Sequence, residues 1–277
     1  MSRFHSPAAP ITRDFCHPVS VIPDTTDRPQ VPAADQTLRV LSFLARQRGP
    51  VAARTIAEQL AIPRSSVYHL LTAMAAHGFV VHLGSERRWG LGTAAFELAG
   101  GYARQEPLAR LGRPLIAALA DRAGESAHLA VMTGRDVLYI VEERAPRRPA
   151  LVTDVGVRLP AHLTATGRAM LAHLPREQVR ALYPDAAAFS DRTGRGPRRP
   201  GELRELLRES RARGHATEDG EVTIGLRSVG VPVLDHAGWP AAAIAVTWPE
   251  DAGREPDELA ALAGEAAREL SRRIGRR

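Results

Sequence analysis

A basic and polar cluster opens one predicted helix of this 277-residue chain, in the stretch IPRSSVYHLL at residues 62–71. An arginine side chain can form paired hydrogen bonds to guanine or hold a phosphate, and serine hydroxyls can bond phosphate oxygens or cap the helix. The N-terminus of a helix also favours anions. The outward-facing positions at this end are Arg64, Ser65, Ser66, Tyr68 and His69. These residue types predict contact with a nucleic acid.

Two helices are predicted to precede this cluster. The first starts at Gln36 and ends at Gly49-Pro50. Its apolar positions, which repeat at helical spacing, are Leu38, Leu41, Leu44 and Ala45. A second, shorter helix fits residues 53–60, with Ile56 and Leu60 on one face.

The helix that carries the cluster is the third, and a hairpin follows it. Pro63 suits the first helical turn, where its missing N–H costs nothing, and Gly78 suits the left-handed position after the last turn. The apolar face is formed by Val67, Leu70, Leu71 and Met74. Residues 79–91 read as two strands around Gly84-Ser85. Three helices and a hairpin predict a winged helix-turn-helix, whose second motif helix reads the major groove.

The charge distribution supports this interpretation over that of an ordinary solvated helix with capping serines. Residues 35–104 hold eight arginines and four acidic residues, a net +4 within the +6 of the whole chain. A concentrated positive charge is what a phosphate-binding surface requires. Arg87 and Arg88 lie in the hairpin, where they can meet a neighbouring backbone or minor groove, and Arg54 on the second helix is a further candidate contact.

Composition excludes several other classes of protein. The single Cys16 cannot form an intrachain disulfide, and no Cys/His cluster has metal-ligand spacing. The N-terminus lacks an apolar signal core, and no apolar run approaches the roughly 18 residues that a membrane helix needs. We therefore expect a cytoplasmic protein with no metal and no cofactor. Residues 1–34 contain six prolines and little apolar pattern, so we expect a disordered tail or a misassigned start.

The second half of the chain predicts an α+β domain with an antiparallel sheet. A helix over residues 93–103 is predicted to link the two halves, and an amphipathic helix follows over 106–126. Strands are predicted in three places, at residues 126–144 as a hairpin, at 149–156, and at 226–248 as a hairpin turning at 236–239. Further helices are predicted at residues 165–174, 201–214 and 255–274. Hairpins with helices grouped around them are typical of this class.

The ordered motifs of the chain resemble those of the IclR family of bacterial transcriptional regulators. They are IPRSSVYHLL, RWGLG, HLAVMTGRDVLYI, LPAHLTATGRAML, GLRSVGVPV and AAAIAVTWP. The resemblance starts at about Gln36, after the expected tail (1–34), and implies a winged helix-turn-helix that binds operator DNA (35–92), a linker helix (93–104) and a GAF-like sensor domain (105–277). It further implies a repressor or activator, a small effector such as a carboxylate or aromatic acid, and a homodimer or tetramer.

The same resemblance implies an effector site. Backbone N–H groups of residues 165–167 would face an anion, and Glu218 stands where the family commonly has an acidic residue. Ser228 stands where many members have cysteine, and on the final strand only Thr247 retains a hydroxyl. The implied site residues are Leu151, Leu159, Ala165, Thr166, Gly167, Glu218, Leu226, Ser228, Ala245 and Thr247. Arg168 replaces the family's usual lysine, which we interpret as the arginine bias of a GC-rich genome.

Two alternatives remain open at this point. A hydrolase would need a serine, a base within hydrogen-bond reach and a group that orients the base. The candidates are His162, His215, Asp219 and Ser228, but no GxSxG turn is present and Ser228 falls in a predicted strand. The other alternative is a DNA-binding regulator whose degenerate sensor responds to protein partners. We therefore expect no catalytic residue.

Overall fold

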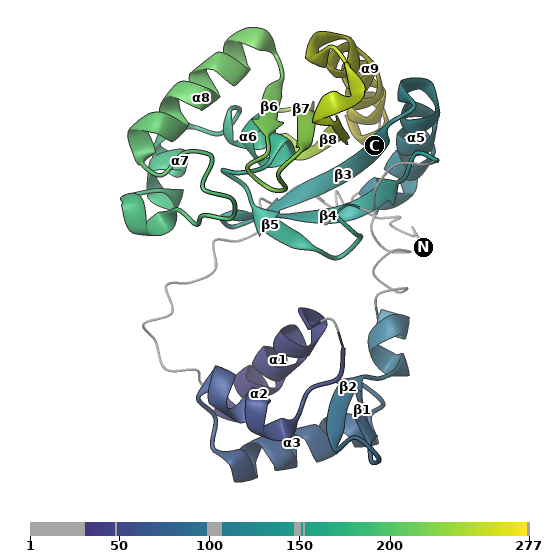
Figure 1. Cartoon of the computed structure of the whole chain (residues 1–277), viewed down its shortest axis with the longest axis vertical. Coiled ribbons are helices and arrows are strands. Elements are labelled where there is room, and N and C mark those ends of the chain that lie inside the picture. The colour runs from purple at the N-terminus through teal and green to yellow at the C-terminus, as the bar shows by residue number, and fades with distance from the viewer. Residues whose placement is uncertain (1–30, 48, 99–106, 147–150, 152, 276–277) are drawn as a thin grey trace, which may run out of the picture.

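The computed structural model describes residues 31–47, 49–98, 107–146, 151 and 153–275, which form an N-terminal and a C-terminal body with separate buried cores (Figure 1). In those ranges no helix has the length and apolar content that a membrane span requires. Residues 93–98 are helical, as predicted for the linking helix. The rest of that helix and residues 1–30 of the predicted tail lie outside the described residues.

Three helices and a hairpin make up the N-terminal body, as the sequence predicts. They are α1 (Pro32–Ala45), α2 (Ala53–Leu60), α3 (Arg64–Ala76), β1 (Val80–Leu83) and β2 (Arg88–Leu91). Val51 adds a backbone bridge to Trp89 in β2, which ties the hairpin to the segment between α1 and α2. The first helix begins within the predicted tail because a proline suits the first turn, where its missing N–H and fixed φ cost nothing.

The buried face of α1 differs from the prediction. Val40 and Leu44 are buried, whereas Leu38 is 64% exposed and Ala45 is exposed. Residues 40 and 44 are about one turn apart and pack in the core with α2 and α3. Position 38 is two residues from Val40, about 200° around the helix, and therefore points away from that core. The predicted faces of α2 and α3 are confirmed at Ile56 and at the buried residues Val67, Leu71 and Met74.

The connection between α2 and α3 is a tight turn. Ala61 ends α2 in the left-handed conformation (φ 52°), and Pro63 is the N-cap of α3, one residue before the predicted position. No side chain caps α3, so Ser65 and Ser66 do not serve as caps. Gly78, at φ 73°, occupies the left-handed position that the sequence predicts after the helix.

A six-stranded sheet forms the centre of the C-terminal body, and all its neighbouring strands are antiparallel. Its order is β5-β4-β3-β8-β7-β6. The strands are β3 (Ser126–Thr133), β4 (Asp136–Glu143), β5 (Arg158–Pro160), β6 (Ala216–Asp219), β7 (Leu226–Leu234) and β8 (Pro240–Pro249). The pairing of β3 with β8 joins the two ends of the domain's sequence at the middle of the sheet.

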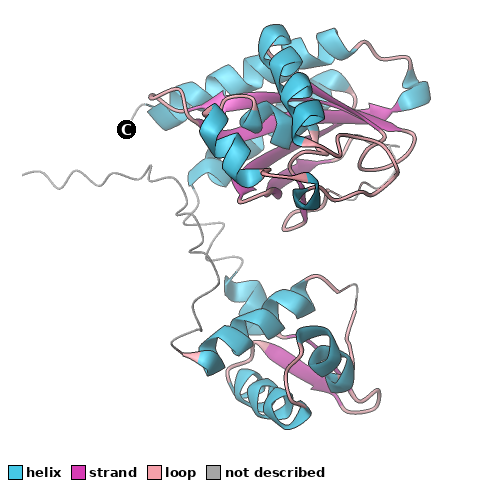
Figure 2. Ribbon diagram, turned by 90° about the vertical axis from the view of Figure 1, so that its left-hand side faces the viewer, coloured by secondary structure: helices cyan, strands magenta, loops and turns pink. Residues whose placement is uncertain are grey.

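Helices cover both faces of this sheet (Figure 1, Figure 2). One face packs against α5 (Pro107–Ala123) and α9 (Pro256–Gly275), around a core that includes Leu129, Ile244 and Leu270. The other face packs against α6 (Ala165–Leu171), α7 (Arg176–Leu182) and α8 (Pro200–Arg213), around Met170 and Leu203. Short 3-10 turns occupy Ala186–Ala188 and Glu250–Ala252. The predicted α+β class is confirmed.

One predicted strand was wrong. Of residues 149–156, those that the structure describes are not in a strand, and the third strand of the sheet is β5 instead. Gly156 has a φ of 88°, and the Val157 N–H donates to the Asp154 oxygen, so the chain turns here before pairing with β4. Leu151 is buried although it is not in a strand, whereas Val155 is 56% exposed, so a short apolar run alone does not identify a strand.

Candidate functional site

The N-terminal tip of α3 presents an exposed polar surface. Arg64, Ser65 and His69 are exposed, Tyr68 is 46% exposed, and Ser66 is partly buried. Val67 and Leu71 point into the core with Leu70 packed beside them, and Tyr68 and His69 project outward from the same helix. The structure therefore gathers the predicted α3 candidates on one surface, at the end of the helix where backbone N–H groups favour anions.

The other predicted DNA contacts lie on neighbouring elements. Arg54 on α2 is exposed and forms an ion pair with Glu58, with 2.6 Å between Nε and Oε1. Arg87 lies at the hairpin turn in the left-handed conformation, with a φ of 52°, and is exposed. Arg88 in β2 is also exposed, and its Nη1 donates to the Pro50 oxygen at 3.4 Å. All three arginines are therefore exposed on the N-terminal body, which we call the head.

A cavity of about 400 Å³, counted to its open mouth, lies on the α6 side of the sheet. Its lining contains eight of the ten effector positions implied by the resemblance: Leu151, Ala165, Thr166, Glu218, Leu226, Ser228, Ala245 and Thr247. The other described lining residues are His128, Tyr139, Thr153, Thr164, Val222 and Thr223, which the sequence did not indicate. We call this cavity the pocket.

Strand register places three of these side chains in one row. Glu218 in β6 is directly opposite Ser228 in β7, and Ser228 is directly opposite Thr247 in β8. Directly opposed residues on neighbouring strands point to the same face with close Cβ atoms. The Ser228 hydroxyl donates to Glu218 Oε2 at 3.0 Å and lies 2.9 Å from the Thr247 hydroxyl.

His128 in β3 extends the row by one more strand. Its Nε2 lies 3.2 Å from the Thr247 hydroxyl, and its Nδ1 lies 3.4 Å from the hydroxyl of Thr153. Burial, with the positive charge of Arg144 as a smaller cause, lowers the pKa of His128 to about 3. The imidazole is therefore neutral at physiological pH and carries one hydrogen, which it can donate along the row.

Glu218 holds its carboxyl group in an apolar setting at the other end of the row. The side chain is buried, and its Oε1 accepts the Val222 N–H at 2.9 Å. Burial raises the pKa of Glu218 from 4.5 to about 7, and the nearby charge of Glu221 adds to this effect, while the hydrogen bonds from Val222 and Ser228 and the charge of Arg168 oppose it. Near neutral pH this carboxyl group exchanges a proton with solvent.

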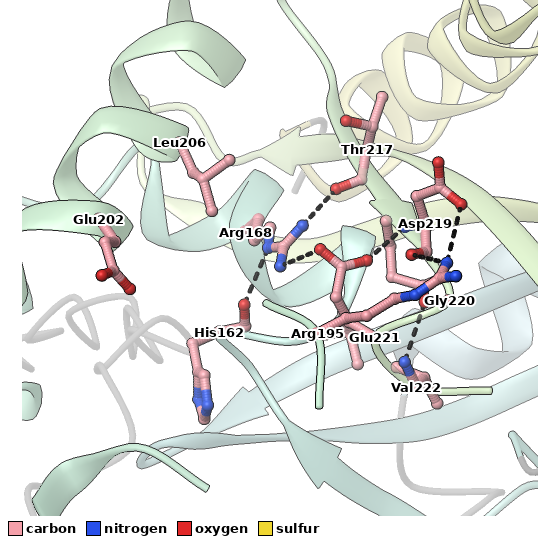
Figure 3. A network of polar contacts seen from close by, with 12 residues as sticks. His162, Arg168, Arg195, Glu202, Leu206, Thr217, Asp219, Gly220, Glu221 and Val222 are labelled. Atoms are coloured by element: carbon pink, nitrogen blue, oxygen red, sulfur yellow. Dashed lines mark hydrogen bonds and ion pairs between the residues drawn. The ribbon is translucent and has the colours of Figure 1, made fainter. Parts of the chain in front are cut away.

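Arg168 on α6 bonds the loop that follows β6 (Figure 3). Its guanidinium donates to the His162 oxygen at 2.8 Å, to the Thr217 oxygen at 2.7 Å and to Glu221 Oε1 at 2.8 Å. The other oxygen of Glu221 accepts the Asp219 N–H. This buried pair holds α6 against β6 and the loop, and it gives Arg168 a structural role that arginine bias does not explain.

Two residues of the implied site do not line the pocket. Leu159 is buried in the core between the sheet and α6. Gly167 uses its N–H to bond the N-cap hydroxyl of Thr164 at 3.0 Å, so that N–H is not directed at a ligand. A Cβ at Gly167 would lie 2.2 Å from the Ala161 oxygen. Gly167 is therefore required for close backbone packing at the start of α6.

The residues of the hydrolase alternative do not come together. Ser228 bonds Glu218 and Thr247, whereas the His162 Nε2 bonds the Ser190 oxygen at 3.0 Å. His215 faces Asp257 on α9, with 3.5 Å between Nε2 and Oδ1. Asp219 pairs with arginines at the surface. Among these four candidates, Ser228 therefore does not bond either histidine. Among the described residues no group of three or more His, Cys, Asp or Glu could hold a metal ion.

A head with an exposed recognition helix and a second body with a polar pocket together define a DNA-binding transcriptional regulator with an effector-binding domain. The family model for the IclR helix-turn-helix domain matches residues 33–84, and that for the bacterial transcriptional regulator IclR C-terminal region matches residues 100–272. The chain belongs to the IclR family of bacterial transcriptional regulators.

Relatives and solved structures agree with this assignment. The chain is 29% identical to the transcriptional repressor IclR of Escherichia coli over 79% of this chain and 81% of that protein. It is 31% identical to the regulator BhcR of Paracoccus denitrificans over 86% of each chain. An IclR homologue from Microbacterium hydrocarbonoxydans, solved with 4-hydroxybenzoate, shares the fold with a TM-score of 0.74 at 22% identity, over 87% of this chain and 98% of that one. The curated relatives are regulators of transcription, and this protein is one as well and not an enzyme.

We expect the substitution Arg64→Ala to weaken operator binding by about 1–3 kcal/mol if the guanidinium reads a guanine. The preference of the protein for a particular base should relax at one position in each operator half-site, because only the base-specific contact is lost. Fluorescence anisotropy with the operator and a set of single-base variants measures both effects. Arg176→Ala, at an exposed arginine of α7, is the matched control. Equal weakening on every sequence would assign Arg64 to a phosphate, and no weakening would contradict its place on the recognition surface.

Proposed function

We propose that the protein binds a roughly palindromic operator as a dimer of winged helices in the bacterial cytoplasm, and that a small organic acid in the pocket changes this binding. The observation that carries the proposal is the polar row of Glu218, Ser228 and Thr247, which lies in the lining of the pocket beside Leu226. Polar groups that converge on one cavity are typical of small-molecule sites.

The ligand or operon given for two similar proteins favours an acid as the effector of this protein. A homologue of the same fold was solved with 4-hydroxybenzoate, and a relative 29% identical to this chain is the acetate operon repressor of Salmonella typhimurium. We extend the acid named for those proteins to this pocket because the hydroxyl groups of Thr166 and Thr223, which lie outside the polar row, line it and can donate to a carboxylate.

Exposed apolar side chains on the head support a dimer. Leu38 on α1 is 64% exposed, and Phe96 and Leu98 in the helical residues 93–98 are 82% and 65% exposed. Large apolar side chains that solvent reaches to this extent are candidates for burial against a second copy of the chain. A twofold dimer presents two recognition helices to two half-sites, so the operator should mirror the protein symmetry.

Thermal melting with a panel of organic acids, including acetate and 4-hydroxybenzoate, tests the proposed effector site. A ligand that binds only the folded protein raises its melting temperature once its concentration exceeds Kd. We expect at least one acid to do so. A panel without any stabilising acid would contradict the proposal and would favour a regulator controlled by protein partners.

We expect Thr247→Ala to abolish the effect of the stabilising acid on operator binding, because the Thr247 hydroxyl connects His128 to Ser228 at the centre of the polar row. Operator affinity without the acid should stay within about threefold, well under one tenfold step. Gel shifts with and without the acid measure both quantities. Thr133→Ala, in the same sheet but outside the pocket lining, is the matched control. An unchanged response in Thr247→Ala would place the effector elsewhere.

A further inference from the structure

The hydrogen atoms of the polar row can be counted. Four contacts join Thr153 to His128, His128 to Thr247, Thr247 to Ser228, and Ser228 to Glu218, at 3.4, 3.2, 2.9 and 3.0 Å. Three hydroxyl groups and one neutral imidazole supply four hydrogens. When Glu218 is ionised, these four hydrogens fill the four contacts if every group donates toward Glu218. The row then has no hydrogen left to offer to a ligand.

The ionised row also presents a negative charge to the pocket without a cation of its own. None of the described lining residues is an arginine, and the sequence contains no lysine. The titratable groups around Glu218 are Glu221 in the next loop, Arg168 on α6, Tyr139 on β4 and His128 on β3. Arg168 is already paired with Glu221 at 2.8 Å. An anion entering this pocket would therefore meet an uncompensated carboxylate.

We infer that Glu218 is the specificity-determining residue of the pocket, and that it takes up one proton from solvent when a carboxylate effector binds. The inference rests on the proposed effector function. The reaction joins an effector carboxylate, the Glu218 carboxylate and one proton into a complex in which the Glu218 O–H donates to the anion. No other bond changes. Alternatively the row reverses, and the added hydrogen emerges at the Thr153 hydroxyl, which also lines the pocket.

The position of Glu218 explains why the proton is available near neutral pH. The carboxyl group is buried, and its pKa lies near 7, so protonation costs little free energy at the pH of a cell. The arrangement selects ligands that arrive as monoanions and discriminates against dianions, for which one proton does not remove the repulsion. It also makes effector affinity depend on pH.

Isothermal titration calorimetry of the full chain with 4-hydroxybenzoate tests this inference. If that acid gives no heat, the probe is the acid that raises the melting temperature most. Titrations at pH 8 in two buffers of different ionisation enthalpy should show uptake of nearly one proton per bound acid. With a pKa near 7, the apparent Kd should rise about tenfold between pH 6 and pH 8. Glu218→Gln, which keeps the side-chain shape, should remove both the proton uptake and the pH dependence.

Two controls separate the possible outcomes. Glu177→Gln, at an exposed position of α7, should behave as the wild type. The uncharged analogue 4-hydroxybenzamide, or the amide of whichever acid is used, should bind without proton uptake. Binding of the acid with a Kd independent of pH from 6 to 8 would overturn the inference and leave the proposed function standing. Equal proton uptake with the amide would also overturn it. No binding by any acid would contradict the proposed function and this inference together.

Discussion

Replacing Arg168 with methionine should lower the free energy of unfolding by about 3–5 kcal/mol, because it leaves the buried Glu221 carboxylate without its partner. Arg168 also donates to the backbone oxygens of His162 and Thr217, so the substitution leaves two further acceptors in the protein interior. Chemical denaturation followed by circular dichroism measures the loss. The result would show that α6 and the loop after β6 depend on this one side chain for their position.

Two further variants identify the cause of that loss. Arg208→Met removes a fully exposed arginine paired with Glu205 on α8 and should leave the denaturation midpoint unchanged. In the Arg168→Met background, Glu221→Gln should restore part of the stability, because it removes the unpaired charge and keeps an acceptor for the Asp219 N–H. A loss in Arg168→Met no larger than that in Arg208→Met would contradict a stabilising role for the buried pair.

The second large effect is a pH dependence of stability that Glu218 causes. Its pKa is raised from 4.5 to about 7 in the folded protein, so between these values the folded state binds more protons than the unfolded chain. Stability must then fall as pH rises through this window. The shift corresponds to about 3 kcal/mol at 1.36 kcal/mol per pH unit. Glu218→Gln should therefore become more stable relative to wild type by about that amount between pH 4.5 and pH 8.

The comparison with Glu218→Gln is necessary because His128 acts in the opposite direction. Its pKa is lowered to about 3 in the folded protein, so stability contributed by His128 is lost as pH falls below 6.5. The two effects overlap in the wild type. The difference in the free energy of unfolding between wild type and Glu218→Gln, followed against pH, contains only the effect of Glu218. If the free energies of unfolding of wild type and Glu218→Gln change in parallel from pH 4.5 to pH 8, Glu218 ionises as an ordinary surface carboxylate does.

Local sequence patterns were sufficient to predict the head and most elements of the C-terminal body. The helical spacing around Val67 and the hairpin at Gly84-Ser85 involve residues close in sequence, so the periodicity indicates them directly. The buried face of α1 was predicted less well, because apolar residues lie on more than one side of this helix. Packing against two other helices buries Val40 and leaves Leu38 exposed.

The pocket could be predicted only in part. The resemblance placed Glu218, Ser228 and Thr247, and the sheet register explains why they form a row. It did not indicate His128, which precedes Thr247 by 119 residues and reaches it only because β3 pairs with β8. No local pattern reports which strands are neighbours in a sheet, so side chains contributed by distant strands were missed.

The central claim is that occupation of the pocket changes the affinity of the head for DNA. A ligand can do this only through different affinities for two arrangements of the heads. The most direct measurement is a titration of the wild-type protein with its fluorescent operator, in the absence and presence of a saturating stabilising acid. We predict a change in operator Kd of at least about fivefold, the lower end of typical allosteric coupling. The operator should change the affinity for the acid by the same factor, since coupling is reciprocal. Identical operator Kd values with and without a bound acid would contradict the claim.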